Sequence, residues 1–155
     1  MSHSRTGIGL GSSLEFNWIV PGLAQGSYPL PPAAALDSFD TVVFAAMEAQ
    51  PRVTPPPRKE AILFPLDDNP YIPVSHREAG ALRQLATKLA RQIRSGRKVL
   101  VTCMEGRNRS GLIVGSILIA LGHAPRAAVE LVKKRRSRPA LTNPMFERYL
   151  ATAWR

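Results

Sequence analysis

The residues best suited to chemistry in this chain lie in one short stretch, Val101-Thr-Cys-Met-Glu-Gly-Arg-Asn-Arg-Ser-Gly111. Within it, Cys103 is followed six residues later by Arg109 and then by Ser110. A thiolate is a strong nucleophile, and the planar guanidinium of an arginine can hold two phosphate oxygens at once. A serine hydroxyl can donate a hydrogen bond to the sulfur. The spacing therefore predicts a nucleophilic thiolate that faces a bound phosphate.

The position of this stretch between two apolar segments supports that interpretation. A short β-branched run precedes it, and the residues that follow are apolar all round. The first turn of a helix exposes unpaired N–H groups that favour an anion, and a glycine allows the loop to turn tightly. The phosphate-binding residues expected here are Met104, Glu105, Gly106, Arg107, Asn108 and Arg109. Glu105 either braces the loop or points to solvent, and the alternative for Cys103 is an ordinary core cysteine at a strand end.

Hydrolysis of a phosphate ester also requires an acid that protonates the departing oxygen. The chain has four aspartates, Asp37, Asp40, Asp67 and Asp68, and the last two follow the apolar run that ends at Phe64. Strand ends on one edge of a parallel sheet converge, so this pair can reach the phosphate. An Asp-Asp-Asn-Pro segment is also a good turn, whose side chains can simply cap the backbone.

Short apolar runs alternate with helical patterns along the chain, as in a sheet with crossover helices. Breakers such as Gly96 and good first-turn residues such as Pro125 bound these segments. Strands are predicted at 41–45, 61–65 and 98–102, and helices at 82–93, at 111–121, from Pro125 into Lys133–Arg136, and after Asn143. The alternation predicts an α/β fold with a mostly parallel sheet of four to five strands and helices on both faces.

Length and composition limit the remaining possibilities. The chain has 155 residues, which predicts a single domain over 1–155, with residues 1–15 a candidate flexible segment. One cysteine cannot form an internal disulfide, and three scattered histidines have no zinc-site spacing, so we expect neither a metal nor a cofactor. The apolar runs are too short for a signal peptide or a membrane span, which predicts a cytoplasmic protein.

The charge of the chain is strongly asymmetric. The net charge is +10, of which residues 1–76 carry −3 and residues 77–155 carry +13. This asymmetry predicts an anionic partner for the second half. Nucleic acid is one such partner, but the composition does not favour it, since five Phe, three Tyr and two Trp lie mostly in apolar patterns. A phosphorylated protein or another phosphoester is the expected substrate.

At the level of families, the signature from Cys103 to Ser110 resembles that of the dual-specificity branch of the cysteine-based protein tyrosine phosphatases. Trp18–Ser27 is similar to the opening strand pair of that family, Phe64–Asn69 to its general-acid segment, and Leu141–Phe146 to the loop before its last helix. The Asn-Arg-Ser-Gly ending resembles compact bacterial and phage members and the RNA 5′-phosphatase branch. The resemblance covers most of the chain and implies the α/β fold described above.

The resemblance also implies roles for individual residues. It makes Asp68 the general acid, with Asp67 as the second choice, and gives Ser110 a role in the departure of the sulfur. Arg138 occupies a position from which some members contact a second anionic group. The family usually has His before the nucleophile, whereas this chain has Thr102, which either assists the thiolate in part or is an ordinary strand residue.

These observations together indicate a metal-independent phosphomonoester hydrolase that forms a phosphocysteine intermediate on phosphotyrosine, phosphoserine or phosphothreonine proteins. The first alternative is a phosphatase for a polyanionic substrate such as a phosphoinositide or an RNA 5′-phosphate. The second is a catalytically weak phosphate-binding module.

Overall fold

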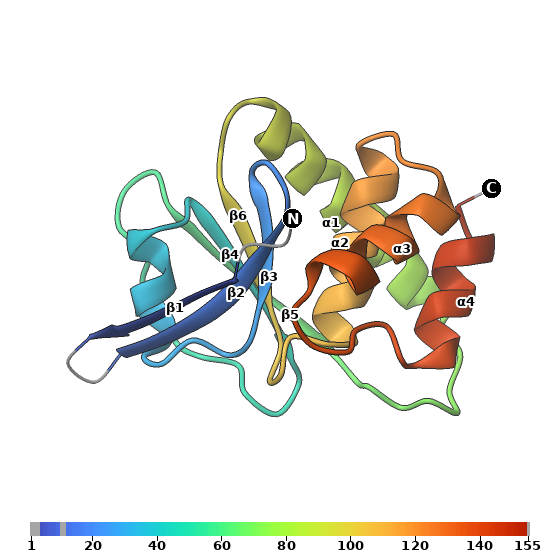
Figure 1. The fold of residues 1–155 in the computed structure, drawn as a ribbon, viewed down its shortest axis with the longest axis horizontal. Helices are drawn as coiled ribbons and strands as arrows, with labels where there is room; N and C mark the ends of the chain where they lie inside the picture. The colour runs from blue at the N-terminus through green and yellow to red at the C-terminus, as the bar shows by residue number, and fades with distance from the viewer. Residues whose placement is uncertain (1–3, 10–11, 155) are drawn as a thin grey trace.

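The computed structural model describes residues 4–9 and 12–154 (Figure 1). Its strands are β1 Ser4–Gly9, β2 Ser12–Val20, β3 Leu23–Gly26, β4 Thr41–Ala46, β5 Glu60–Leu66 and β6 Val99–Thr102. They form one sheet in the order β1-β2-β3-β6-β4-β5. The pairs β3–β6, β6–β4 and β4–β5 are parallel, whereas β1–β2 and β2–β3 are antiparallel. The four parallel strands therefore end at one edge of the sheet, the carboxyl edge.

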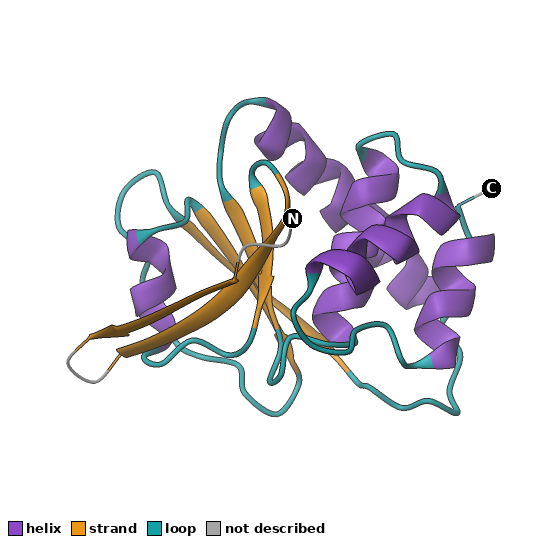
Figure 2. Ribbon diagram, in the orientation of Figure 1, coloured by secondary structure: helices purple, strands orange, loops and turns teal. Residues whose placement is uncertain are grey.

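Helices cover both faces of the sheet, but unequally (Figure 2). The α-helices are α1 His76–Arg94, α2 Arg109–Ala120, α3 Pro125–Arg135 and α4 Pro144–Thr152, and all four lie on one face. The short 3-10 helix η1, Pro32–Asp37, lies on the other face over a smaller apolar cluster around Phe39 and Phe44. In the part of the chain that the structure describes, no helix is long and apolar enough to cross a bilayer.

The expected α/β class and mostly parallel sheet are confirmed, and each predicted strand and helix is present, although α1 begins at His76 and not at the expected residue 82. The sheet has six strands rather than four to five, because the N-terminal segment adds an antiparallel hairpin to the parallel strands. Part of the candidate flexible segment 1–15 is therefore strand, while residues 1–3 and 10–11 lie outside the described residues.

Local sequence explains how the helices begin and pack. Ser75 caps α1 by accepting from the Glu78 amide while the Glu78 side chain accepts from the Ser75 amide, which satisfies two otherwise unpaired donors. α2 is buried on nearly all sides. A Cβ at its Gly115 would lie 2.7 Å from Leu150 of α4, so the glycine allows these two helices to approach closely. This packing fixes the start of α2 behind the carboxyl edge.

The strand order places the central strand β6 between β3 and β4. The chain leaves β6 at Cys103 and enters α2 at Arg109, so residues 103–108 form a loop at the middle of the carboxyl edge. The segments that follow β3, β4 and β5 end at the same edge. Ligand sites of parallel α/β sheets usually lie at this edge, because the strand ends bring several loops together there.

Candidate active site

Most backbone carbonyls of the 103–108 loop are held by donors that lie outside the loop. Five successive carbonyls, from Met104 to Asn108, each accept at least one hydrogen bond. The Met104 carbonyl accepts from the Tyr28 amide (3.1 Å), and the Glu105 carbonyl accepts from Arg136 Nη2 (3.2 Å) and Arg138 Nη1 (3.3 Å). The Gly106 carbonyl accepts from Gln25 Nε2 (3.1 Å) and Arg136 Nε (2.8 Å). The Arg107 carbonyl accepts from the Leu141 amide (3.2 Å), and the Asn108 carbonyl accepts from the Leu112 amide (2.8 Å).

The amide N–H groups of the same residues, unlike their carbonyls, are left without hydrogen-bond partners among the described residues. Among the described residues, none accepts a hydrogen bond from the amides of Met104 to Asn108. A loop whose carbonyls are bonded on one side and whose amides are free is an anion-binding nest, and here it leads into the N-terminus of α2. Gly106 has φ +68°, a conformation that glycine adopts without strain. The loop can therefore bind a phosphate through its backbone.

The thiol of Cys103 lies at the start of this loop. Its side chain is almost fully buried, and Sγ lies 3.3 Å from Oγ of the buried Ser110. Cys103 also lines a cavity of about 360 Å³ at the carboxyl edge, whose other lining residues are Glu48, Asp68, Met104, Glu105, Arg107, Asn108 and Arg109. The sulfur is thus buried in the protein but reachable from this cavity, unlike an inert core cysteine.

Arg109 points into the same region and is paired with Glu48, which follows β4. Nη1 donates to Glu48 Oε1 and Nη2 to Oε2 at 3.2 Å, so the two side chains meet fork to fork. Burial alone would lower the pKa of the Arg109 guanidinium, but the Glu48 hydrogen bond and the charges of Cys103, Glu48 and Asp68 raise it. The same hydrogen bond lowers the pKa of Glu48. Glu48 therefore orients the arginine beside the cavity.

Sequence analysis did not identify Glu48. The only available signal was its position three residues beyond the strand predicted at 41–45, where side chains from neighbouring strands converge. A lone glutamate in an exposed loop gives no pattern by itself. Its function depends on a partner 61 residues away in the chain.

Asp68 lies at the cavity with both carboxylate oxygens occupied. Asn108 Nδ2 donates to Oδ2 at 3.0 Å, and Asn143 Nδ2 donates to Oδ1 at 2.7 Å. Asn143 also caps α4 by accepting from the Met145 amide. The carboxyl group is therefore held in place from the 103–108 loop and from the start of α4. Asp67, the other candidate acid, is exposed and does not line the cavity.

Arg136 is a buried brace behind the loop, not a surface charge. Its side chain is fully buried, and beyond the loop carbonyls it donates to Glu15 Oε2 at 2.6 Å, Glu15 Oε1 at 2.6 Å and Asn17 Oδ1 at 2.7 Å. Burial by itself would raise the pKa of Glu15, but the hydrogen bonds and charge of Arg136, together with the charge of Arg138, lower it. Sequence analysis placed Arg136 only at the basic end of a predicted helix, Lys133–Arg136, because a sequence cannot show which arginine of such a run turns inward.

The other arginines expected at the site are also paired. Arg107 lines the cavity, and its Nη1 lies 3.1 Å from Oε2 of Glu105, so the Glu105 side chain binds a neighbouring arginine at the exposed surface. Arg138, expected to contact a second anionic group, lies 3.3 Å from Glu15 and does not line the cavity. The structure thus brings together Cys103, Ser110, Asp68, Arg107 and Arg109, with Arg138 behind the loop.

Thr102 does not contact the thiol. Its hydroxyl donates to the Val43 carbonyl of β4 at 2.8 Å and so joins two strands at the carboxyl edge. In the described parts of the chain, no group of three or more His, Cys, Asp or Glu side chains is arranged to hold a metal ion. Among the groups that line the cavity are the Cys103 thiol, the loop with its free amides, the Arg109 guanidinium and the Asp68 carboxyl group, which suit attack on a tetrahedral anion.

Comparison with known proteins agrees with this geometry. Neither a protein-family model nor a curated protein matches the chain. Among solved structures, DUSP15 has a TM-score of 0.70 at 22% identity, over 90% of this chain and 86% of that chain. Human DUSP28 has a TM-score of 0.67 at 22% identity, over 94% of each chain. A human tyrosine phosphatase-like serine/threonine/tyrosine-interacting protein has 0.65 at 20% identity, over 87% of this chain and 92% of that chain. The chain therefore has the dual-specificity phosphatase fold, and the resemblance noted in the sequence is confirmed at the level of the fold.

The tight crossing of the loop over β3 leads to a first prediction. A Cβ at Gly106 would lie 2.6 Å from the Gly26 carbonyl oxygen and would also meet Arg136, whereas a Cβ at Gly96, which has φ +93°, meets nothing within 4 Å. We expect Gly96→Ala to cost about 1–2 kcal/mol of unfolding free energy from the positive φ alone. Gly106→Ala should cost about a further 1–3 kcal/mol for the clash. Urea unfolding of both variants measures the difference, and equal losses would contradict the close approach.

The buried Arg136–Glu15 pair leads to a second prediction. Glu15→Gln leaves the charge of Arg136 buried without its counterion, so we expect the free energy of unfolding to fall by about 3–5 kcal/mol. The control is Glu147→Gln, which removes a half-exposed pair with Lys133 and should cost at most about 1 kcal/mol.

The same pair predicts how stability depends on pH. Because folding lowers the pKa of Glu15, the stabilisation from its carboxylate is complete above the unfolded value of 4.5 and is lost as the pH falls through the folded value. Wild type should therefore lose stability on acidification below pH 4.5 more steeply than Glu15→Gln. Parallel slopes in urea titrations across this range would show that Glu15 carries no such contribution.

Proposed function

We propose that this chain is a phosphomonoester hydrolase that acts through the Cys103 thiolate and a phosphocysteine intermediate. The observation that carries the proposal is the outward pairing of the five carbonyls from Met104 to Asn108, which leaves the amides of the same residues free beside a reachable thiol. Such a nest binds a phosphate and stabilises the charge on its equatorial oxygens during transfer. The cytoplasmic location expected from the sequence stays a prediction.

In the first step, the Cys103 thiolate attacks phosphorus in line with the ester oxygen. The S–P bond forms as the P–O ester bond breaks, and Asp68 donates its proton to the departing oxygen. Arg109, held by Glu48, has N–H groups remaining with which it can bind two phosphate oxygens. The products of this step are the free alcohol or phenol and a phosphocysteine.

In the second step, water hydrolyses the phosphocysteine. The Asp68 carboxylate takes a proton from the water as its oxygen attacks phosphorus, and the S–P bond breaks. The thiolate leaves next to Ser110, whose hydroxyl is 3.3 Å away and can donate to the sulfur. Inorganic phosphate is released, and Asp68 is again protonated for the next cycle.

The charges around the cavity favour a phosphorylated protein over a polyanionic substrate. The arginines in and behind the loop are each paired with a carboxylate: Arg107 with Glu105, Arg109 with Glu48, and Arg136 and Arg138 with Glu15. Asp68 adds another acidic group to the cavity. A phosphoinositide or an RNA 5′-triphosphate brings further negative charges that this balanced site would not attract.

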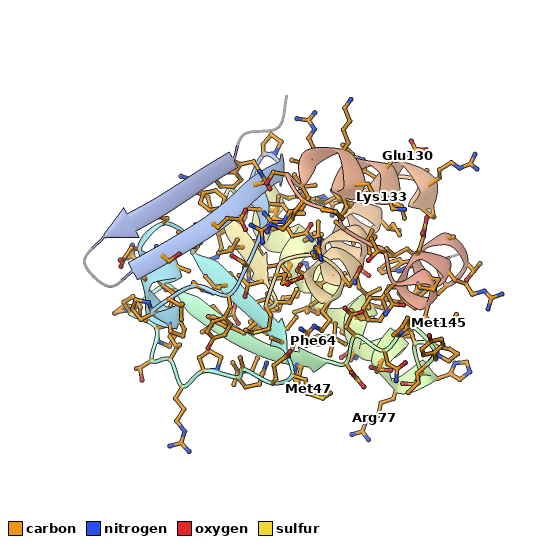
Figure 3. All side chains as sticks on the ribbon, turned by 60° about the horizontal axis from the view of Figure 1, so that its bottom comes forward. Met47, Phe64, Arg77, Glu130, Lys133 and Met145 are labelled. Carbon is orange, nitrogen blue, oxygen red and sulfur yellow. The ribbon has the colours of Figure 1, made fainter. Side chains whose placement is uncertain are left out.

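Exposed apolar side chains at the carboxyl edge support the same substrate class. Among the described residues, five of the large exposed hydrophobic side chains follow the parallel strands that end there: Leu30, Met47, Tyr71, Ile72 and Met104. In Figure 3, in which this edge comes forward, Met47 projects from the surface. Exposed apolar groups around a site are typical of protein-binding surfaces. Such side chains can contact the residues on either side of a phosphorylated residue in a substrate protein.

A phosphate-binding module without turnover is the second candidate function. Thr102 replaces the usual histidine before the nucleophile and bonds to β4 instead of the loop. One protein with this fold is named for interaction, a tyrosine phosphatase-like serine/threonine/tyrosine-interacting protein. Both candidates require the same phosphate site, so only the rate of hydrolysis distinguishes them.

Substitution of the nucleophile and the acid tests the mechanism. We expect Cys103→Ser to lower kcat for p-nitrophenyl phosphate by about 10⁴-fold or more while the variant still binds vanadate. Asp68→Asn should lower kcat by about 10²–10⁴-fold, and more for alkyl phosphates, which are poor leaving groups. Asp67→Asn is the matched control and should change little. Wild-type protein that binds vanadate but gives no product burst would support the binding module instead.

A substrate panel tests the preferred class. Phosphotyrosine and phosphoserine peptides with apolar flanking residues should show a higher kcat/KM than phosphoinositides or RNA 5′-triphosphate, with Cys103→Ser as the blank. Because the loop arginines are already paired, KM for the peptides should change little as salt rises, whereas an electrostatically driven substrate would lose affinity. A larger kcat/KM for RNA or phosphoinositide would overturn the assignment of substrate class.

A further inference from the structure

A glutamine from β3 reaches beneath the loop and contacts the serine next to the thiol. Gln25 is fully buried and pairs with Val101 of β6. Its Nε2 donates to Ser110 Oγ at 3.0 Å and to the Gly106 carbonyl at 3.1 Å. The two strong bonds use both amide hydrogens, so the side chain is oriented by its contacts.

These contacts determine where the hydroxyl proton of Ser110 can go. An amide nitrogen only donates, so the serine oxygen must accept from Gln25. The serine hydrogen then needs another acceptor, and the nearby candidate is Cys103 Sγ at 3.3 Å. Among the described residues, no other side chain or carbonyl accepts from this hydroxyl.

The two protonation states of the thiol differ in how well they satisfy this network. If Cys103 is a thiol, its sulfur is only a weak acceptor for the Ser110 hydrogen, so this buried hydroxyl is poorly satisfied. If Cys103 is a thiolate, the charged sulfur accepts the same hydrogen in a stronger, charge-assisted hydrogen bond. The hydrogen bond therefore stabilises the ionised sulfur more than the neutral thiol.

We propose that Gln25 is a positioning residue that acts through Ser110 to stabilise the Cys103 thiolate. In this chain it supplies a second side-chain hydrogen bond behind the nucleophile, at a point where Thr102 supplies none because its hydroxyl is bonded to Val43. The catalytic importance of this effect rests on the proposed phosphatase function, but the effect on the thiol itself does not.

The network acts in addition to the charged groups around the sulfur. Those that line the cavity come from three directions: Arg109 from the start of α2, Glu48 and Asp68 from the segments after β4 and β5, and Glu105 and Arg107 from the loop itself. They are unchanged in a variant that alters only Gln25. The β3 side contributes a neutral donor, whose removal therefore tests hydrogen bonding separately from charge.

The pH dependence of thiol alkylation tests the proposal without any turnover. The chain has a single cysteine, so iodoacetamide reports on Cys103 alone. Gln25→Met keeps a similar shape and removes both donors. We expect its alkylation midpoint to move to higher pH and its rate on the acidic side to fall on the order of tenfold, the loss of a hydrogen bond that supports a charge. The limiting rate at high pH should be unchanged.

A double-mutant cycle separates positioning from a general structural role. If Gln25 acts through Ser110, Gln25→Met in a Ser110→Ala background should shift the midpoint no further. Gln92→Met removes another glutamine with two side-chain partners, Thr41 and Glu60, away from the loop, and should leave the midpoint unchanged. Should Gln25→Met fail to fold by circular dichroism, Gln25→Asn shortens the amide beyond reach of Ser110 and gives the same comparison.

Each outcome decides the proposal. A midpoint that stays at the wild-type value in the Gln25 variant, or that moves equally with and without Ser110, would overturn it. A shifted midpoint together with undetectable hydrolysis by wild type would support the role of Gln25 and contradict only the proposed phosphatase function.

Discussion

The outward pairing of the carbonyls of the 103–108 loop is the constraint on which the site depends. A peptide loop offers as many acceptors as donors, and an anion is bound only if the acceptors are turned away from it. Here donors from outside the loop hold each carbonyl from Met104 to Asn108, among them the side chains of Gln25, Arg136 and Arg138. The free amides are therefore a consequence of contacts made behind the cavity.

Carboxylates balance the arginines that build this arrangement. Arg136 could not be buried without Glu15, because an uncompensated charge in the interior is very costly. Glu48 does the same for the half-buried Arg109 and also sets the direction of its guanidinium. The cavity therefore combines strong local hydrogen bonding with little net charge. Much of the positive charge of the second half lies elsewhere, as in the last turn of α3, which carries Lys133, Lys134 and Arg135.

The fold brings these groups together through strand order. β6 lies between β3 and β4, so Gln25 reaches the loop from one side and Glu48 from the other. The start of α4 adds Asn143, which with Asn108 holds the Asp68 carboxyl group. A nucleophile, an acid and an arginine are thus positioned by side chains from β3, from the segment after β4, from the loop itself and from the start of α4.

Sequence analysis was sufficient for the elements and for the residues adjacent to the nucleophile. Hydrophobic periodicity and breakers act over a few residues, and the residues from Cys103 to Ser110 are close together in the sequence. Both patterns can therefore be recognised from the sequence alone. The sequence did not predict four features: the β1–β2 hairpin, the role of Glu48, the burial of Arg136 and the contact of Gln25 with Ser110. The contacts of Glu48, Gln25 and Arg136 each depend on a partner between 61 and 121 residues away, whereas the β1–β2 hairpin pairs segments that are close in the chain. The long-range contacts follow from strand order and packing, because only the folded chain brings distant segments within hydrogen-bond distance.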